Sequence, residues 1–195
     1  MSLTKLLIPT YVQMLAALGG WLDKARAERG EAADALLAAR LAPDMFPLST
    51  QVRFACVQAL EGASRLRGAE FPPAVGLLLD EGRQADDQPG TIAQALARIG
   101  ETRAALEALP AGALDMEPDA PLAHALPSGM IFDLTAEQYA RDWALPQFYF
   151  HLMIAYAILR HEGVALGKVD YIPHMLAHIR PAPGAGEGGA KHAKS

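Results

Sequence analysis

The stretch ALPQFYFHLMIAYAILRHE, residues 144–162, decides the fold of this chain. Between Pro146 and Arg160, only Gln147 and His151 interrupt a run of apolar and aromatic side chains. A segment that is apolar nearly all round predicts a helix that other parts of the protein must cover. Gln147 and His151 are four residues apart, so this helix would place both on one face. We therefore expect a buried helix that carries two hydrogen-bonding side chains into the interior.

The composition limits the classes of function that need to be considered. Of the 195 residues, 51% are hydrophobic and 20% are charged, which is typical of a globular domain with a sizeable core. The chain has 17 Lys and Arg against 22 Asp and Glu, so its formal net charge is −5. An acidic chain without basic clusters argues against a nucleic-acid partner. The single cysteine, Cys56, excludes a disulfide within the chain and a cysteine-based zinc cage.

The first residues do not have the pattern of a secretion signal. Pro9, Thr10 and Gln13 interrupt the apolar residues, and no small-residue cleavage site follows soon after them. No apolar run reaches the roughly 18 uninterrupted residues that a membrane span needs. We therefore expect a cytoplasmic protein with no membrane partner.

Apolar residues at three- and four-residue steps predict three further long helices. The first covers residues 3–29 and the second covers residues 48–68. The third follows Thr91 and Gln94, which have the spacing of a capping box, and it stops at Pro110. Together with the segment 144–162, these helices predict an all-α four-helix bundle.

Two shorter segments join these helices. Residues 31–41 are rich in alanine and predict a short helix with Leu36, Leu37 and Leu41 facing inward. Residues 71–90 are rich in proline, glycine and acidic residues, and they predict a connector, of which residues 75–79 could pack against the bundle.

A small β-hairpin is expected before the last helix. Residues 122–126 and 130–134 are short alternating segments on either side of the turn residues 127–129. Since one hairpin cannot form a core, it should lie across the end of the bundle. Thr135 and Gln138 repeat the capping-box spacing and should open a short helix that continues through Trp143.

Gln147 and His151 are the leading candidates for a functional site. In one interpretation, His151 is a metal ligand or a general base in a cleft, with Gln147 beside it. In the other, His151 is a core histidine whose hydrogen bonds are satisfied within the protein. The sequence leaves both interpretations open.

The proline-bounded segment RLAPDMFP, residues 40–47, is the second candidate. Arg40 and Asp44 could line the mouth of a pocket and bind a polar substrate. The preferred interpretation is structural: Asp44 accepts backbone N–H groups or pairs with Arg40, and Phe46 fills the core.

The remaining candidates are weaker. His174 and His178 have the spacing of two zinc ligands on one helical turn, but they lie outside the bundle pattern, and coincidence is the better explanation. Cys56 lies among apolar residues and is expected to be an inert core thiol. His124, in the hairpin, has no evident partner. Residues 173–195 form a C-terminal extension that we expect to be disordered from about residue 181.

Three stretches carry a resemblance to a known family. They are ARLAPDMFPL (39–48), LPQFYFH (145–151) and AYAILRHEGV (155–164). On these motifs the chain resembles a bacterial domain-of-unknown-function family, numbered nineteen-ninety-three (DUF1993). The similarity covers about residues 3–171, and it implies a DinB-like, YfiT-like bundle domain over residues 1–172.

The resemblance also implies a place for a metal site. Many members of the DinB-like superfamily bind a divalent metal through three histidines, two of them four apart on the last helix. His151 falls where the second of that pair belongs, and Gln147 takes the place of the first. The third ligand should come from the start of the second helix, where Gln51 or Asp44 is the nearest polar residue. Only His151 carries over as a metal ligand, so a zinc or nickel site would be degraded or absent.

Two functions remain open at this stage. The first is a protein that binds an unidentified small molecule in a pocket between helices. Its candidate residues are His151, Gln147, Gln51, Asp44 and Arg40. The second is a metal-dependent transferase or hydrolase of the DinB and YfiT type with an atypical site. A homodimer is a reasonable expectation for such a bundle, although no sequence feature indicates one.

Overall fold

The computed structural model describes residues 2–126 and 128–180 of the chain. The predicted all-α bundle with one small β-hairpin is confirmed. Within the described ranges, no helix combines the length and the apolar character that a membrane crossing requires.

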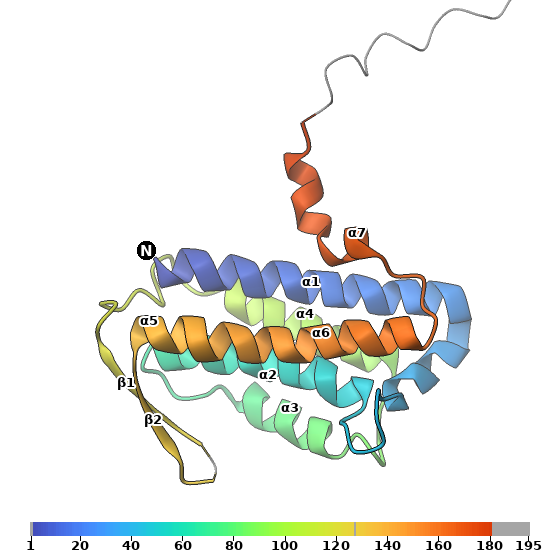
Figure 1. The fold of residues 1–195 in the computed structure, drawn as a ribbon, viewed down its shortest axis with the longest axis horizontal. Helices are drawn as coiled ribbons and strands as arrows, with labels where there is room; N and C mark the ends of the chain where they lie inside the picture. The colour runs from blue at the N-terminus through green and yellow to red at the C-terminus, as the bar shows by residue number, and fades with distance from the viewer. Residues whose placement is uncertain (1, 127, 181–195) are drawn as a thin grey trace, which may run out of the picture.

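Four long helices lie side by side and form the bundle (Figure 1). They are α1 (Leu3–Arg29), α2 (Leu48–Leu66), α4 (Ile92–Glu107) and α6 (Leu145–His161). Helix α2 packs against both α6 and α4, and α1 closes the bundle by packing against α4 and α6. The core is built from the apolar stripe that each helix turns inward, as the periodicity of the sequence predicts.

The prediction that the last helix is covered on all sides is wrong along one edge. The buried residues of α6 recur at helical spacing, which directs a single face toward α2 and α1. They are Phe148, His151, Leu152, Ala155, Ile158 and Leu159. The side chain of Phe150 is 58% exposed, and Met153 is also exposed. Helix α6 is therefore amphipathic in packing, although its sequence is apolar nearly all round.

The prediction of a connector over residues 71–90 is also wrong, because this segment contains a helix, α3 (Pro73–Arg83). Proline at the first helical position fits the start of a helix, since that position needs no N–H group. Val75 and Leu78 are buried, and α3 packs along α2. The proline and glycine content of the segment is typical of a loop, and only a narrow stripe of the helix, including Val75 and Leu78, faces the core.

The segment between α1 and α2 is a 3₁₀ helix, η1 (Gly30–Ala38), which buries Leu36 and Leu37. Leu41 was expected to face inward, but it lies beyond the end of η1 and is exposed. The proline turn that follows brings the chain back so that the Leu48 amide donates to the Ala39 carbonyl at 2.8 Å. This closure fixes where α2 begins.

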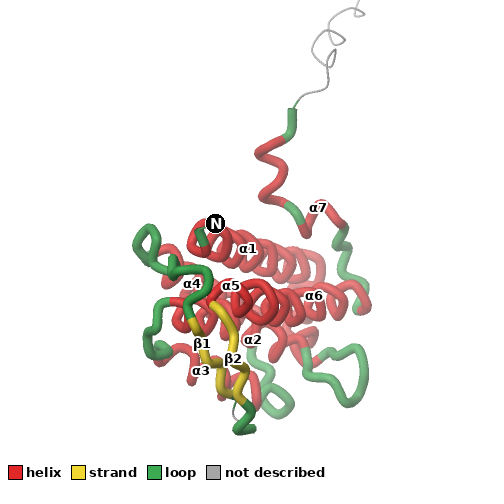
Figure 2. The backbone as a smooth tube through the Cα atoms, turned by 60° about the vertical axis from the view of Figure 1, so that its left-hand side comes forward, coloured by secondary structure: helices red, strands yellow, loops and turns green. Residues whose placement is uncertain are grey.

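The hairpin lies at one end of the bundle, beside the ends of α2 and α3 (Figure 2). Strand β1 (Pro121–Ala125) pairs antiparallel with β2 (Ile131–Thr135). The chain then passes through a single α-helical turn, α5 (Ala136–Gln138), and a π-helix, η2 (Tyr139–Ala144), directly into α6. The capping boxes predicted at Thr91 and Thr135 are both present.

After α6, a short helix α7 (Lys168–Tyr171) is anchored to α1, and the 3₁₀ helix η3 (Pro173–His178) leads away from the bundle (Figure 1). The Trp21 indole N–H donates to the Asp170 carbonyl at 2.7 Å, and the Tyr171 ring stacks on Trp21. The predicted disorder from residue 181 falls outside the described residues.

Candidate functional site

His151 is held by a residue of the second helix. Its Nδ1 lies 2.9 Å from Oε1 of Gln51, and the Gln51 amide nitrogen donates to the Phe46 carbonyl at 3.2 Å. With the amide in this orientation, Oε1 is the acceptor, so Nδ1 of His151 carries the proton. The second ring nitrogen, Nε2, is left with a free lone pair, and it forms no hydrogen bond with the described residues.

Aromatic rings fix the plane of the His151 imidazole. The Phe54 and Phe150 rings meet it edge to face, with centroids 5.4 Å and 5.3 Å away. The residue is 9% exposed, and burial lowers the pKa of His151 from 6.5 to about 4. The imidazole is therefore neutral at pH 7 and acts as a hydrogen-bonding group rather than a charge.

His151 lines one side of a cavity of about 550 Å³, which we call the imidazole cavity. The cavity lies between α2, α3, the hairpin and the π-helix that leads into α6. Phe54, Phe71 and Trp143 form much of its apolar wall. Its hydrogen-bonding side chains are Gln58, Glu61, Arg65, Arg83, His124 and His151.

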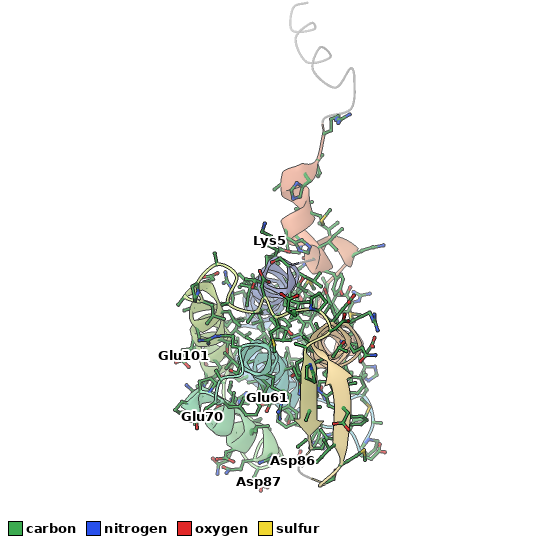
Figure 3. All side chains as sticks on the ribbon, turned by 90° about the vertical axis from the view of Figure 1, so that its left-hand side faces the viewer. Lys5, Glu61, Glu70, Asp86, Asp87 and Glu101 are labelled. Carbon is green, nitrogen blue, oxygen red and sulfur yellow. The ribbon has the colours of Figure 1, made fainter. Side chains whose placement is uncertain are left out.

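Helix α2 supplies a polar stripe to this cavity. Phe54, Gln58, Glu61 and Arg65 follow one another at steps of four, three and four residues, so they share one face. Figure 3, in which Glu61 is labelled, places that residue on the side of α2 that faces α3 and the hairpin. Burial raises the pKa of the Glu61 carboxyl, and the positive charge of Arg65 opposes the rise. This stripe was not predicted, although the steps of four and three residues on a helix with otherwise small inward residues are a usable signal in the sequence.

His124, on strand β1, contributes to the lining of the cavity. Its side chain is 3% exposed, and neither ring nitrogen has a hydrogen-bond partner among the described residues. It packs against the Trp143 and Tyr139 rings, with centroids 4.4 Å and 5.3 Å away. Burial, followed by the nearby charge of Arg65, lowers the pKa of His124 to about 4. Since buried polar groups are normally paired, this imidazole stands out as an unused hydrogen-bonding group.

The other predicted site residues do not meet His151 in this cavity. Gln147 is partly buried on α6 and does not line the cavity. The Arg40 guanidinium binds the Asp86 carboxylate at 2.7 Å, rather than pairing with Asp44, whose side chain is exposed. Phe46 does not fill the core, because it is half exposed and rests its ring on Phe54. Of the predicted partners, Gln51 is the one that binds His151.

The residues around His151 do not fit the zinc or nickel site that the resemblance implies. Of the side chains at the expected ligand positions, Gln51 and Gln147 are neutral amides, which bind these metals weakly. Asp44, the other candidate, is exposed and does not line the cavity of His151. In the described part of the chain, no three His, Cys, Asp or Glu side chains are grouped as metal ligands would be. His174 and His178, on η3, therefore lack a third ligand there. Cys56 is buried in the core, where burial raises the pKa of its thiol to about 12.

Comparison with known proteins agrees with this fold. A family model, "Domain of unknown function (DUF1993)", matches residues 3–172. The chain is also similar to the crystal structure of a DinB family member protein from Shewanella denitrificans, with a TM-score of 0.68 and 33% sequence identity. That match covers 87% of this chain and 90% of the other. No curated protein matches the chain significantly. The protein therefore belongs to the DUF1993 family and has a DinB-like four-helix-bundle fold.

Proposed function

We propose that this protein binds a small organic molecule in the imidazole cavity, next to His151 and His124. The volume of about 550 Å³ falls within the range of roughly 300–1,000 Å³ that is usual for pockets for drug-sized ligands. Such pockets combine apolar and aromatic walls with a few converging polar groups. The walls of Phe54, Phe71 and Trp143, with two imidazoles among them, match that description.

The observation that carries the proposal is the unpartnered His124 ring. Leaving a buried hydrogen-bonding group unpaired costs on the order of 1–3 kcal/mol. Neighbouring atoms cover both His124 nitrogens, so a ligand recovers this free energy when the ring turns toward the cavity. Nε2 of His151 offers a second acceptor to the same cavity. Both rings are neutral at pH 7, which suits recognition of a ligand by hydrogen bonds.

The side chains that line the cavity favour binding over covalent catalysis. None of them is a serine, threonine, cysteine or lysine, and the nucleophile types that are present are Glu61 and the two histidines. No hydrogen bond with the described residues joins these three side chains into a nucleophile–base pair. The metal-dependent transferase or hydrolase, our alternative from the sequence, gains no support from the amides beside His151.

A fragment screen on the full chain tests this proposal. Binding of small aromatic fragments would be followed by ligand-observed NMR and by ¹H–¹⁵N spectra of the protein. Gln58→Trp would fill the cavity, whereas Gln13→Trp would add the same side chain at an exposed site on α1. We expect fragments that bind the wild type and the Gln13→Trp variant but not Gln58→Trp. The proposal fails if no fragment binds, or if Gln58→Trp leaves every interaction unchanged.

A further inference from the structure

We infer that the ligand of the imidazole cavity carries a carboxylate, which binds between Arg65 and His124, attached to an apolar or aromatic body. This inference rests on the proposed function and adds the chemical class of the ligand. It depends on which donors in the cavity are unused, on the balance of charge, and on the shape of the walls.

Arg65 and His124 bring unused donors to the same end of the cavity. Nε of Arg65 is buried and has no partner among the described residues. Nη2 of Arg65 donates to the Ala125 carbonyl over a long 3.4 Å, and Ala125 directly follows His124 in β1. The guanidinium also lies 5.0 Å from the centre of the Phe71 ring, which limits its freedom to turn away. A ligand acceptor at this end would meet the N–H groups of Nη1 of Arg65, which makes no hydrogen bond with the described residues, since Nε is covered. If the His124 ring turns toward the cavity, the acceptor would also meet an N–H of that ring in one tautomer.

The balance of charge favours an anion at this end over a neutral acceptor. The ionisable lining groups are Arg65, Arg83 and Glu61, together with two neutral imidazoles. Arg83 is 59% exposed and lies 3.9 Å from the Asp80 carboxylate, so its charge is largely balanced outside the cavity. Arg65 makes no ion pair within 4.0 Å in the described residues, and charge-assisted hydrogen bonds are about twice as strong as neutral ones.

The walls restrict the rest of the ligand. Phe71 and Trp143 offer broad apolar surfaces, while Glu61 disfavours a second negative charge. A carboxylate with one negative charge and a planar or aliphatic body meets both conditions. A phosphate with two charges does not, because it would add repulsion from Glu61 and bury more charge against the apolar wall.

Carboxylate binding should be linked to proton uptake by His124. The charged groups that line the cavity with this ring are Arg65 and Glu61 on α2 and Arg83 on α3, and the charge of Arg65 acts on the ring. His151 lines the same cavity, and Tyr139 packs against the His124 ring. Without ligand, the pKa of His124 is about 4. A bound carboxylate favours the protonated ring and raises this pKa, so the affinity should rise as the pH falls from 7 toward 5.

Isothermal titration calorimetry on the full chain tests the inference with three probes that share one ring system. They are 2-naphthoate, 2-naphthamide and 2-naphthylmethylammonium. The variants are Arg65→Met, which removes the guanidinium at similar length, and Arg67→Met, which removes an exposed arginine from the end of the same helix. His124→Phe adds a variant that keeps the aromatic packing, and circular dichroism checks that each variant is folded.

We expect naphthoate to bind more tightly than the amide and the ammonium compound. Arg65→Met should weaken naphthoate binding about 10- to 100-fold, the size expected for a lost charge-assisted hydrogen bond, whereas Arg67→Met should leave it unchanged. Proton uptake on binding is measured by repeating the titration in buffers of different ionisation enthalpy. His124→Phe should abolish this uptake. Equal binding of all three probes, unaffected by Arg65→Met, would overturn the carboxylate inference and leave the cavity as a binding site. Failure of all three to bind would count against both proposals.

Discussion

Nδ1 of His151 and Oε1 of Gln51 are 2.9 Å apart, although the two residues are 100 positions apart in the sequence. This hydrogen bond joins the last helix of the bundle to the first turn of α2. It sets the tautomer of His151 and leaves Nε2 free for the cavity. A position where the resemblance implies a metal ligand is therefore occupied by a side chain that orients the imidazole.

Replacing Gln51 with alanine should destabilise the protein. The substitution leaves the buried Nδ1–H of His151 and the Phe46 carbonyl without their partner, at a cost of about 1–3 kcal/mol. Gln58→Ala is the matched control, because Gln58 is partly buried on the same helix and makes no hydrogen bond with the described residues. Urea unfolding would measure both variants. Equal, small effects of the two substitutions would contradict the role assigned to Gln51.

Stability should fall as the pH decreases from 6.5 to about 4. Burial lowers the pKa of His124 and His151 from 6.5 to about 4, so over this window the unfolded chain binds more protons than the folded protein. Each histidine in its neutral form contributes to the free energy of unfolding, and this contribution is fully present above pH 6.5. It is lost as the pH falls to the folded-state pKa, and the loss amounts to about 3 kcal/mol for each histidine.

Unfolding curves at a series of pH values would check this dependence. His151→Gln should flatten the slope between pH 6.5 and 4, whereas His161→Gln, at an exposed position at the end of α6, should keep it. If both variants retain the wild-type slope, His151 is not held in its neutral form by burial.

Replacing two glycines of α3 with alanine should change the stability of the protein in opposite directions. A Cβ at Gly82 would lie 2.5 Å from the Phe54 ring, which forms part of the cavity wall and packs on His151. We expect Gly82→Ala to cost about 1–3 kcal/mol and to shift the NMR signals of His151. A Cβ at Gly76 meets no atom within 4 Å, so Gly76→Ala should stabilise the helix by about 0.5–1 kcal/mol. Destabilisation by Gly76→Ala as large as that by Gly82→Ala would contradict the tight contact at Phe54.

Glu81 on α3 should matter for stability because it joins two arginines. Its carboxylate binds Arg53 of α2 at 3.0 Å and Arg98 of α4 at 2.6 Å, and these partners, Arg98 first, lower the pKa of Glu81. Since the Arg53 side chain is buried, Glu81→Gln should cost about 3 kcal/mol. Glu101→Gln removes an exposed partner of Arg98 and should cost less than about 1 kcal/mol. Thermal unfolding distinguishes these outcomes, and equal small losses would mean that the pair with Arg53 contributes little.

Protein purified without an affinity tag should contain zinc and nickel well below one equivalent. Adding either metal should leave the melting temperature unchanged, because amides stand at the expected ligand positions beside His151. Elemental analysis and a thermal melt would measure this. Stoichiometric metal that is lost in His151→Ala would contradict the proposed function and favour the metal-dependent alternative.

The sequence predicted the bundle because hydrophobic periodicity and capping signals act over one or two helical turns. The capping boxes at Thr91 and Thr135 and the turn of the hairpin are local in this sense. Helix α3 escaped prediction because prolines and glycines mask its short apolar stripe. The polar interruption of the apolar run in α6 pointed to His151, and the resemblance added Gln51, whereas periodicity indicated neither their contact nor the cavity.

The rest of the site depends on contacts between distant segments. His124 reaches the cavity because the hairpin folds back against the stripe of Glu61 and Arg65, and no local signal in the sequence specifies that approach. For the same reason, the sequence offered the nearby Asp44 as one partner for Arg40, whereas in the structure Arg40 pairs with Asp86. Long-range packing, rather than the nature of each residue, determines which of these side chains meet.

A crystal structure of the full chain soaked with a fragment that binds in solution tests the central claim most directly. We predict density for the fragment in the imidazole cavity, against Trp143 and within hydrogen-bonding distance of a ring nitrogen of His124 or of Nε2 of His151. A fragment seated elsewhere on the protein, with both imidazoles left without a ligand contact, would contradict it.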